Sequence, residues 1–538
     1  MWLAPLLLAA QDDQPLAPVT GTYAITNATV IVSPGKSIER GTVVIRDGLI
    51  IAVGQQVVVP PDALIVKADS MYVYAGFIDG FSRTGVASPK EGSKEKVKYP
   101  GNPPPDRAGI NPQIDVRDFL NLSDRAVAEL RGQGFTLSQV APQGNLLPGQ
   151  AALVLLGEGT TDQMVIRGKS ALYSELTGAA GVYPSTVMGV MAKWRELYRQ
   201  ASFARGYEAS YAANPAGLER PASDRMLEAF YPVIEKRQPV LFKSEKVIET
   251  QRVLKLKEDL GFELYLADLK EGWPVIEKIR SSGAGVFLSL ELPEEIKSDK
   301  KDGKENTSSA EKKALEERKA AAVASYTSQA AAFAKAGIRF GFSASSVKAA
   351  DIKANLRRMI AAGLNEDAAL AALTTTPAQM LGVANRMGTI DNGKMANLVI
   401  TDKSYFNEKA SVKYIFVEGK LYTNTATKKV ASGKKVNIEG SWTYTTETPQ
   451  GKGGGKLVIK GSTGGFSGTI TNNFSGKEAE VKEILIDGNS ISFSYMIDAG
   501  GNQMKIEVTA QVQDDRFEGS MTAGQFGTFP INGIRDPK

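Results

Sequence analysis

The segment Ala75-Gly-Phe-Ile-Asp-Gly-Phe-Ser-Arg83 sets the architecture of this chain. The apolar run Val73–Ile78 predicts a buried β-strand, and polar residues follow it directly. Alternate residues on a strand point to the same face, so Asp79, Phe81 and Arg83 are predicted to lie in one line. This strand opens a long series of strand and helix patterns.

Strand and helix patterns alternate over residues 72–393. Further strands are predicted at Thr136–Ala141, Ala152–Leu156, Pro239–Phe242, Glu263–Leu266, Val286–Leu290 and Arg339–Phe342. Helices are predicted at Asp124–Gly132, Pro184–Ser202, Lys246–Leu260, Trp273–Arg280, Ala310–Ala336 and Asp351–Ala362. Repeated βα units predict a parallel sheet, open or closed, and the length suits a (β/α)₈ barrel with insertions.

The regions on both sides of this series have strand character. Residues 22–70 contain short strands and turns, and Asp47-Gly48 between apolar runs indicates a hairpin. Residues 394–427 return to strands. Residues 436–538 carry eight short strand patterns at roughly ten-residue spacing, which predicts a separate β-sandwich or small up-and-down barrel.

The composition excludes several kinds of chemistry. The 538 residues include no cysteine and no histidine. Without cysteine there are no disulfides, thiolate metal sites or cysteine nucleophiles. Without histidine there is no Ser-His-Asp catalysis and no His-ligated metal. Lys and Arg total 64 and Asp and Glu total 59, so the net charge of +5 implies no nucleic-acid partner.

The N-terminus suggests export. Residues 1–10 include Trp2-Leu-Ala-Pro-Leu-Leu-Leu-Ala-Ala10, which is typical of a signal peptide. The run is too short to span a bilayer, which needs about 20 residues, and no transmembrane segment is expected elsewhere. We expect a periplasmic or extracellular protein that is not a lipoprotein, because it lacks cysteine. The alternative is an apolar terminus that is only buried or disordered.

Three stretches share a pattern with one known family. They are Asn27 to Gly54 with Ala75–Arg83, then Arg131–Thr136 through Asn145–Gln150, and finally Ala369–Ala378 with Leu381-Gly382 and Arg386–Ile400. In this order and spacing they resemble the amidohydrolase superfamily, nearest to its secreted imidazolonepropionase-like members. The resemblance implies a (β/α)₈ barrel over 72–393 and a composite β domain from 22–70 and 394–427. Residues 436–538 lie outside it.

The resemblance also points to an emptied metal site. In this family the first barrel strand ends in Asp-x-His-x-His, and here Phe81 and Arg83 stand at the two histidine positions. Lys243 aligns with the fifth-strand histidine, and the sixth-strand histidine falls near Leu266-Ala267. Ser345 aligns with the eighth-strand aspartate that serves as general base. That register could slip by one residue, yet residues 341–350 contain no carboxylate.

These replacements cannot serve as the family's metal ligands. A phenyl ring does not coordinate, and a protonated guanidinium repels a divalent cation. We therefore expect no metal, no cofactor and no metal-dependent hydrolysis. Asp79 alone is expected to orient the strand end or to pair with Arg83. Lys243 is expected to be a cation that lines a pocket, with a Schiff-base role as the alternative.

Three functions follow from these residues. The first is a pseudoenzyme that acts as a structural or binding partner, in a homodimer or beside an active, His-containing homologue. The second is a hydrolase of amides, cyclic imides or peptides with rebuilt, metal-free chemistry that uses Asp79, Lys243 or a tyrosine. The third is an exported protein that binds its ligand through the C-terminal β domain, residues 436–538.

Overall fold

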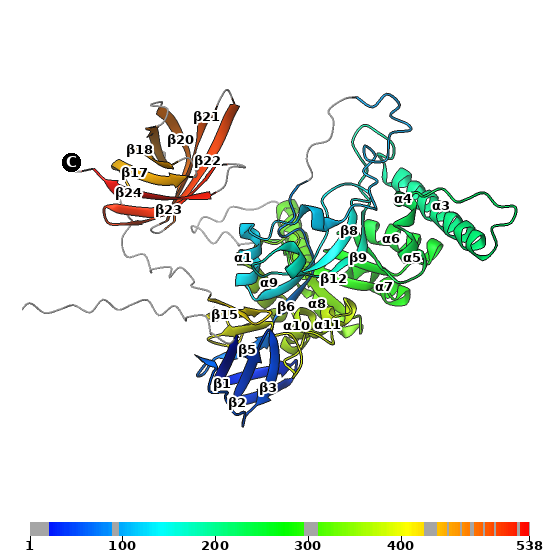
Figure 1. Cartoon of the computed structure of the whole chain (residues 1–538), viewed down its shortest axis with the longest axis horizontal. Helices are drawn as coiled ribbons and strands as arrows, with labels where there is room; N and C mark the ends of the chain where they lie inside the picture. The colour runs from blue at the N-terminus through cyan, green and yellow to red at the C-terminus, as the bar shows by residue number, and fades with distance from the viewer. Residues whose placement is uncertain are drawn as a thin grey trace, which may run out of the picture. The chain divides into compact units, whose positions relative to one another are not determined.

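The computed structural model describes residues 21–88, 96–294, 310–423 and 438–536, with short gaps at 449–450, 463–464, 474–477, 488–489, 500–501 and 524–527. The predicted signal peptide lies outside the described residues. The chain divides into two compact units, Met1–Asn424 and Thr425–Lys538, and each is described by itself. Figure 1 labels their helices and strands.

The first unit is built around a closed barrel of eight strands. In spatial order these run β10-β11-β12-β13-β6-β7-β8-β9, and β9 pairs with β10 to close the barrel. Their bounds are β6 Phe77–Ser82, β7 Phe135–Val140, β8 Gly149–Leu155, β9 Val165–Glu175, β10 Val240–Lys243, β11 Leu264–Leu269, β12 Gly285–Ser289 and β13 Phe340–Ser343. The predicted closed α/β barrel is confirmed.

The predicted all-parallel arrangement is wrong at one strand. β8 runs antiparallel to β7 and to β9, whereas the other neighbouring pairs in the barrel are parallel. Only residues 141–148 connect β7 to β8. A parallel crossover needs a dozen or more residues, so this short connection forces β8 to return antiparallel. The barrel is therefore mixed.

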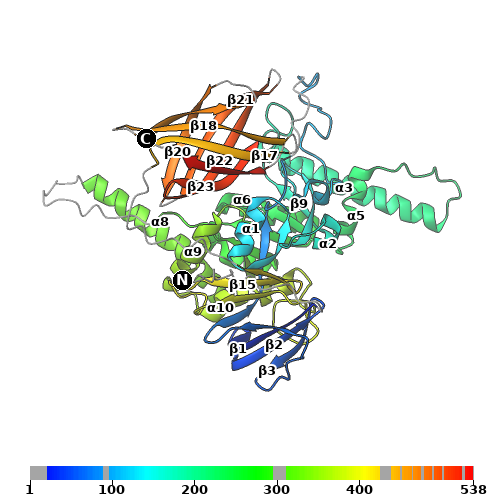
Figure 2. The ribbon, with the colours of Figure 1, turned by 60° about the vertical axis from the view of Figure 1, so that its left-hand side comes forward.

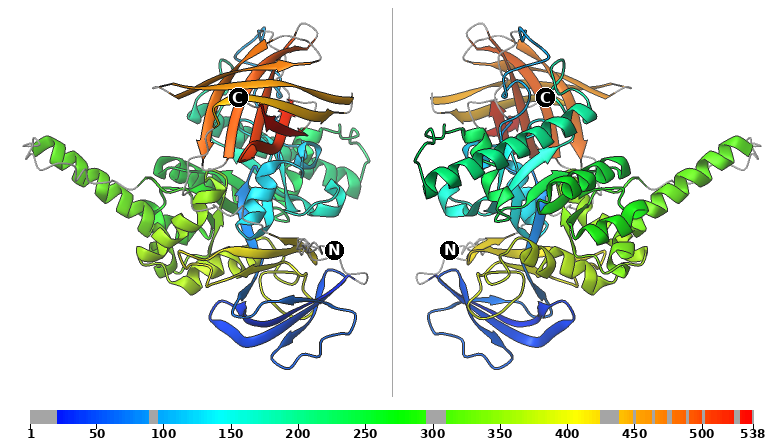
Figure 3. Two further views of the ribbon diagram at one scale, coloured as in Figure 1. Left: turned by 90° about the vertical axis from the view of Figure 1, so that its left-hand side faces the viewer. Right: turned by 90° about the vertical axis from the view of Figure 1, so that its right-hand side faces the viewer.

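Helices follow most of the barrel strands. Those of ordinary length are α1 Arg125–Gly132, α3 Val187–Ala213, α6 Val247–Leu260, α7 Ile276–Ser282, α8 Ala310–Lys335, α9 Ile352–Ala361, α10 Glu366–Leu373 and α11 Thr375–Met380. Short helices are α2 Thr161–Met164, α4 Arg225–Glu228 and α5 Tyr231–Ile234, with 3₁₀ turns η1 Val116–Phe119, η2 Trp273–Val275 and η3 Ala349–Asp351. The N-terminal half of α8 extends away from the barrel (Figure 3). None of the described helices is both long and apolar enough to cross a lipid bilayer.

A second sheet of the first unit joins strands from both flanks of the barrel. Its order is β16-β15-β14-β5-β1-β2-β3, with β4 paired to β1. The strands are β1 Thr22–Ser33, β2 Lys36–Arg46, β3 Leu49–Gly54, β4 Leu64–Lys67, β5 Tyr72–Ala75, β14 Leu398–Thr401, β15 Val412–Val417 and β16 Lys420–Thr423. The blue N-terminal strands and yellow strands of Figure 1 thus form one layer.

A glycine separates this sheet from the barrel. Gly76 lies between β5 and β6, and its amide donates to the Asn397 carbonyl at 2.7 Å. A Cβ at this position would lie 2.2 Å from the Thr136 hydroxyl oxygen. Only glycine allows so close an approach. The single strand predicted over Val73–Ile78 is therefore two strands that belong to different sheets.

The second unit is a closed, all-antiparallel β-barrel in which each strand pairs with the next and β24 pairs with β17. The strands are β17 Gly440–Thr448, β18 Gly451–Ser462, β19 Gly465–Asn472, β20 Glu478–Asp487, β21 Ser490–Ala499, β22 Asn502–Gln513, β23 Arg516–Ala523 and β24 Thr528–Arg535. Figure 2 shows them in orange and red. Of the two predicted forms, the structure selects the barrel.

Candidate functional site

Asp79 is fully buried in the middle of β6, and both of its carboxylate oxygens accept hydrogen bonds. Oδ1 accepts from the Phe81 amide at 3.2 Å and from the Ala344 amide at 2.9 Å. Oδ2 accepts from the Ser138 hydroxyl at 2.6 Å, and Ser138 lies 3.0 Å from the Ser82 hydroxyl. One side chain thus joins strands β6 and β7 to the residue after β13.

Burial dominates the electrostatics of this carboxyl group. Desolvation raises the pKa of Asp79 to about 6, and the hydrogen bonds from Ser138, Ala344, Ser82 and Phe81 oppose that shift without cancelling it. Such a value would suit a general acid or base at neutral pH. The side chain, however, has no exposed surface from which to reach a substrate.

Asp79 also lies on the face of the barrel wall that faces the helices. It is paired with Phe342 of β13, and residues paired across neighbouring parallel strands point to the same face. Phe340 shares this face with Phe342, and its ring lies 6.4 Å from the ring of Phe333 in α8. Asp79 therefore does not share a face with the positions that resemble metal ligands. The predicted Asp79–Arg83 pair does not form.

Aromatic rings fill the space at the first predicted metal position. Phe81 is fully buried and stacks on Tyr173 of β9, with ring centroids 5.2 Å apart. At the preceding residue, a Cβ added to Gly80 would lie 1.9 Å from the ring of Phe287. Phe287 is itself fully buried against Tyr265, at a centroid distance of 5.8 Å. The barrel interior at β6 is consequently packed.

Arg83, at the second predicted metal position, is held by β9. Its guanidinium forms a salt bridge with Glu175 and donates to the Tyr173 hydroxyl at 3.2 Å. Tyr173 in turn donates to Glu175 at 2.7 Å. Burial and the Glu175 carboxylate raise the pKa of Tyr173, so this hydroxyl keeps its proton. The three groups form a closed triad of cation, anion and donor.

The Arg83–Glu175 pair allows a direct test. Glu175→Ala is expected to lower the free energy of unfolding by about 2 kcal/mol, because a largely buried arginine would lose its counter-charge. Chemical denaturation of the full chain measures the change. The matched control is Glu129→Ala, which breaks the exposed Arg125–Glu129 pair and should cost less than about 0.5 kcal/mol. Equal losses of stability in the two variants would show that water can solvate the Arg83 guanidinium in place of Glu175.

Lys243 ends β10 and belongs to a chain of alternating charges. Its Nζ lies 3.1 Å from Glu245, which lies 3.4 Å from Lys270, and Lys270 lies 2.6 Å from Glu291. Burial raises the pKa of Glu245, but Lys243 and Lys270 outweigh burial, so the net shift is downward. Lys243 serves here as the ionic partner of Glu245.

Ser345 lies two residues beyond β13 and is half-buried. The hydroxyl that reaches the neighbouring strand ends is instead that of Ser343, which lies 2.8 Å from the Phe81 carbonyl and 3.0 Å from Asp268. Asp268 of β11 also accepts from Ser346. The ends of β6, β11 and β13 are thus joined by hydrogen bonds among serines and one carboxylate.

These residues do not fit a metal ion. Asp79 has both oxygens engaged and faces the helices, while Arg83 and Lys243 are cations in ion pairs. Within the described ranges, no three His, Cys, Asp or Glu side chains converge on one point. A divalent cation requires several oxygen, nitrogen or sulfur ligands around one centre. This end of the barrel offers hydrogen bonds and ion pairs in their place.

Two residues of this network were missed from the sequence. Glu175 lies on β9, which was not predicted because Arg167-Gly168-Lys169 interrupts its apolar pattern. Asp268 lies at the sixth-strand position, one residue beyond Leu266-Ala267. A carboxylate within the apolar run Leu264–Leu269 was the available signal, because buried acids are rare without partners.

Part of the chain is similar in sequence to a known family. Residues 281–422 match the amidohydrolase family. No curated protein sequence matches the chain. The matched segment includes barrel strands β12 and β13 and the last strands of the second sheet.

The fold agrees with this match. An amidohydrolase from Thermotoga maritima is similar at a TM-score of 0.60 and 19% identity, over 74% of this chain and 100% of that one. An adenosine deaminase from Xanthomonas campestris with bound zinc aligns over 74% of this chain and 92% of that one, with 14% identity and a TM-score of 0.41. The likeness to the Thermotoga maritima protein shows that the first unit shares the fold of that amidohydrolase.

Proposed function

We propose that this protein is an amidohydrolase-fold pseudoenzyme of the imidazolonepropionase-like type, whose barrel serves as a structural or binding partner. The observation that carries the proposal is the chemistry at the strand ends. Phe81 and Arg83 stand where the family's first two ligands are expected, and both are occupied by contacts with Tyr173 and Glu175. Because the Glu175 carboxylate is paired with the Arg83 guanidinium, these two groups do not provide ligands for a catalytic metal ion.

The same contacts weigh against a hydrolase with rebuilt chemistry. The candidate groups for that chemistry are Asp79, Lys243 or a tyrosine, and the first two can be compared directly. Asp79 is fully buried and faces the helices, and Lys243 is paired with Glu245. A general base must lie within hydrogen-bond reach of the proton that it removes, and Asp79 is not exposed to any substrate.

Metal titration and an activity screen test the proposal. After dialysis against a chelator, the purified chain is expected to bind no zinc or manganese tighter than about 1 mM in calorimetry. It is also expected to release no product from amide, cyclic imide and dipeptide substrates. One tightly bound metal per chain, or turnover that Asp79→Asn or Lys243→Met abolishes, would favour the hydrolase instead.

The partner in this proposal is an active, His-containing homologue or a second copy of the chain. Cross-linking in the native source, affinity purification and mass spectrometry should identify one of the two. Light scattering of the purified chain distinguishes the homodimer. If the chain is a monomer and no homologue co-purifies with it, the partner role is contradicted. The metal result is unaffected by that outcome.

A cavity found among the described core residues of the second unit is small. Trp442, Phe493 and Phe517 line a cavity of about 10 Å³ within its core. This is about the smallest space that holds one water molecule. This cavity is therefore too small for a ligand larger than water.

A further inference from the structure

A cavity of about 690 Å³ lies beside β9 in the first unit. It is bordered by β8 and β9, by the short helices α4 and α5, and by the residues that lead into β10. Polar and charged side chains make up most of its lining, and Ala229 and Pro232 are the apolar members. The volume falls in the usual range of small-molecule sites, which is about 300–1,000 Å³. A ligand of this cavity is therefore expected to be polar.

Lys169 lines this cavity from an irregular part of β9. Between its pairs with Ala151 and Leu153 of β8, strand β9 holds three residues, 168–170, where β8 holds one. Lys169 itself has a φ of 50°, in the left-handed region that a residue with a side chain rarely adopts. Such bulges redirect side chains, and strained backbone is concentrated at ligand-binding sites. Regular pairing is thus lost at the residue that presents a cation to the cavity.

Two buried glutamines hold this irregular backbone. The Gln238 amide donates to the Lys169 carbonyl at 2.7 Å and to the Gln150 side-chain oxygen at 2.7 Å. Gln238 is only 5% exposed and Gln150 only 2%, and both line the cavity. The side-chain oxygen of Gln238 accepts no hydrogen bond from any residue that the structure describes. It therefore offers a fixed acceptor to a ligand that donates a hydrogen bond.

Two cations of the lining have no counter-charge in the described part of the chain. They are Lys169 and Arg225 of α4, and neither side chain forms an ion pair or a hydrogen bond with any described residue. Arg237 also lines the cavity, but it is paired with Glu235 and is not available in the same way. Lys169 and Arg225 are therefore the groups that a ligand with two negative charges would neutralise.

We propose that this cavity binds a phosphorylated sugar. The phosphate carries close to two negative charges at neutral pH and binds Lys169 and Arg225. The sugar hydroxyls donate to the Gln238 side-chain oxygen and to the Glu228 carboxylate, which already accepts from the Ser223 hydroxyl at 2.6 Å. A sugar with one carboxylate would supply only one negative charge to the two cations.

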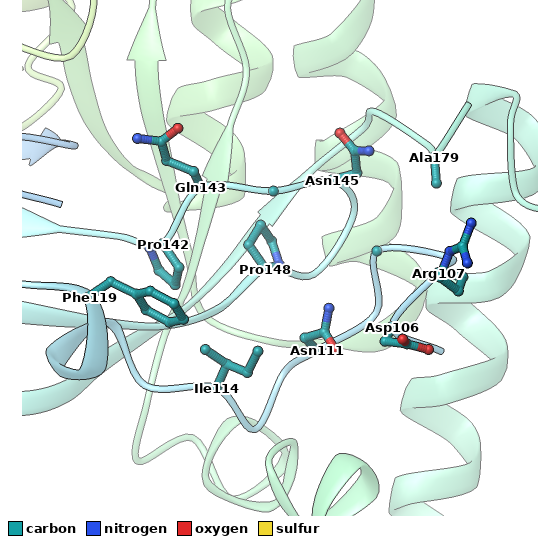
Figure 4. Close-up of a pocket in the computed structure, with 12 residues that line it drawn as sticks. Asp106, Arg107, Asn111, Ile114, Phe119, Pro142, Gln143, Asn145, Pro148 and Ala179 are labelled. Carbon is teal, nitrogen blue, oxygen red and sulfur yellow. The ribbon is translucent and has the colours of Figure 1, made fainter. Parts of the chain in front are cut away.

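A smaller cavity of the first unit, shown in Figure 4, lacks this combination. It has a volume of about 230 Å³ and lies between residues 106–119 and residues 142–148. Arg107 is the cation of its lining, and this side chain already has an interaction partner. Within that described lining, an anion would find no unpaired cation.

The proposed site is separate from the residues that resemble metal ligands. Phe81, Arg83, Lys243 and Ser345 do not line the cavity of about 690 Å³. The inference therefore goes beyond the proposed function and does not depend on whether the barrel is catalytic.

Calorimetry with the full chain tests the proposal, with D-glucose 6-phosphate as the probe. We expect saturable binding of one ligand per chain, with a Kd below about 1 mM. D-Glucose, which lacks the phosphate, and inorganic phosphate, which lacks the sugar hydroxyls, should each bind at least about tenfold more weakly. A hydrogen bond to a charged group contributes more than a factor of ten in affinity, which is why each half of the ligand matters.

Two variants locate the site. Lys169→Asn and Arg225→Gln should each weaken binding of D-glucose 6-phosphate at least about tenfold. Both side chains are exposed, and asparagine tolerates the left-handed backbone at position 169, so the fold should be kept. The matched control is Lys278→Asn, which removes an exposed lysine of α7 outside the cavity and should leave binding unchanged.

Three results would overturn the proposal. The first is no saturable binding of D-glucose 6-phosphate up to about 10 mM. The second is equal binding of D-glucose 6-phosphate and either D-glucose or inorganic phosphate, because one half of the ligand would then be irrelevant. The third is binding that Lys169→Asn and Arg225→Gln weaken no more than Lys278→Asn does.

Discussion

Asp79→Ala is expected to destabilise the first unit by about 3–5 kcal/mol at neutral pH. The substitution leaves the Phe81 amide, the Ala344 amide and the Ser138 hydroxyl without their acceptor in a fully buried place. Each buried donor without a partner costs about 1–3 kcal/mol. Chemical denaturation of the full chain measures the loss, and amide exchange in β6 assigns it to the first unit.

Asp79→Asn is the informative counterpart. Its oxygen can accept from the Phe81 and Ala344 amides, and its NH₂ can donate to Ser138, whose own proton can turn to Ser82 at 3.0 Å. We therefore expect Asp79→Asn to be at least as stable as the parent at pH 7. A loss as large as that of Asp79→Ala would show that the network requires the ionised carboxylate.

The stability of the parent chain relative to Asp79→Asn is expected to change with pH in one direction. Burial raises the pKa of Asp79 to about 6 in the fold, whereas an unfolded aspartate titrates near 3.9. Between about pH 4 and pH 6 the folded chain keeps a proton that the unfolded chain has released. The contribution of Asp79 to stability is thus complete below pH 4 and falls by about 3 kcal/mol as the pH rises to 6 and above. The parent should lose stability relative to Asp79→Asn across this window.

Gly80→Ala is expected to cost about 3 kcal/mol or more. The added Cβ would lie 1.9 Å from the Phe287 ring, which is fully buried. That ring cannot retreat easily, because a Cβ at Gly341 would already lie 3.0 Å from it and Tyr265 packs nearby. Forcing extra atoms into a packed core typically costs about 1–3 kcal/mol, and this overlap is severe. Denaturation of the full chain again gives the value.

Two further variants control this result. Gly101→Ala should change stability by less than about 0.5 kcal/mol, because no heavy atom of the described residues lies within 4 Å of its new Cβ. Adding Phe287→Ala to Gly80→Ala removes the ring and should cost clearly less than the sum of the two single changes. If the costs of the two single changes were additive, the Phe287 ring would not be the group that excludes a side chain at position 80.

The fold was predictable where local patterns repeat. Strand and helix periodicity predicted repeated βα units in a sheet that could be open or closed, and the length of the series and the family resemblance favoured the barrel. The spacing of short strands predicted an all-β second unit with a barrel as one form. The direction of β8 was not predicted, because periodicity shows that a strand exists and not which way it runs. The length of residues 141–148 carried that information.

The candidate site was less accessible to sequence analysis. Alternation along a strand predicted that Asp79, Phe81 and Arg83 share a face, but an irregularity in the β6–β7 register separates Asp79 from Ser82. Alternation fails across such an irregularity. The partner of Arg83, Glu175, is 92 residues away in sequence, and no local pattern joins the two. Absence of a metal and the role as a partner remain predictions.

The second sheet has a consequence for how the chain is made. β5 pairs with β1 on one side and with β14 on the other. More than 300 residues separate β5 from β14, so at ribosomal rates of about 5–20 residues per second the edge of β5 waits for tens of seconds. An open strand edge invites pairing with other chains. During translation this edge can therefore pair with other chains, and a chaperone that covers it would prevent such pairing.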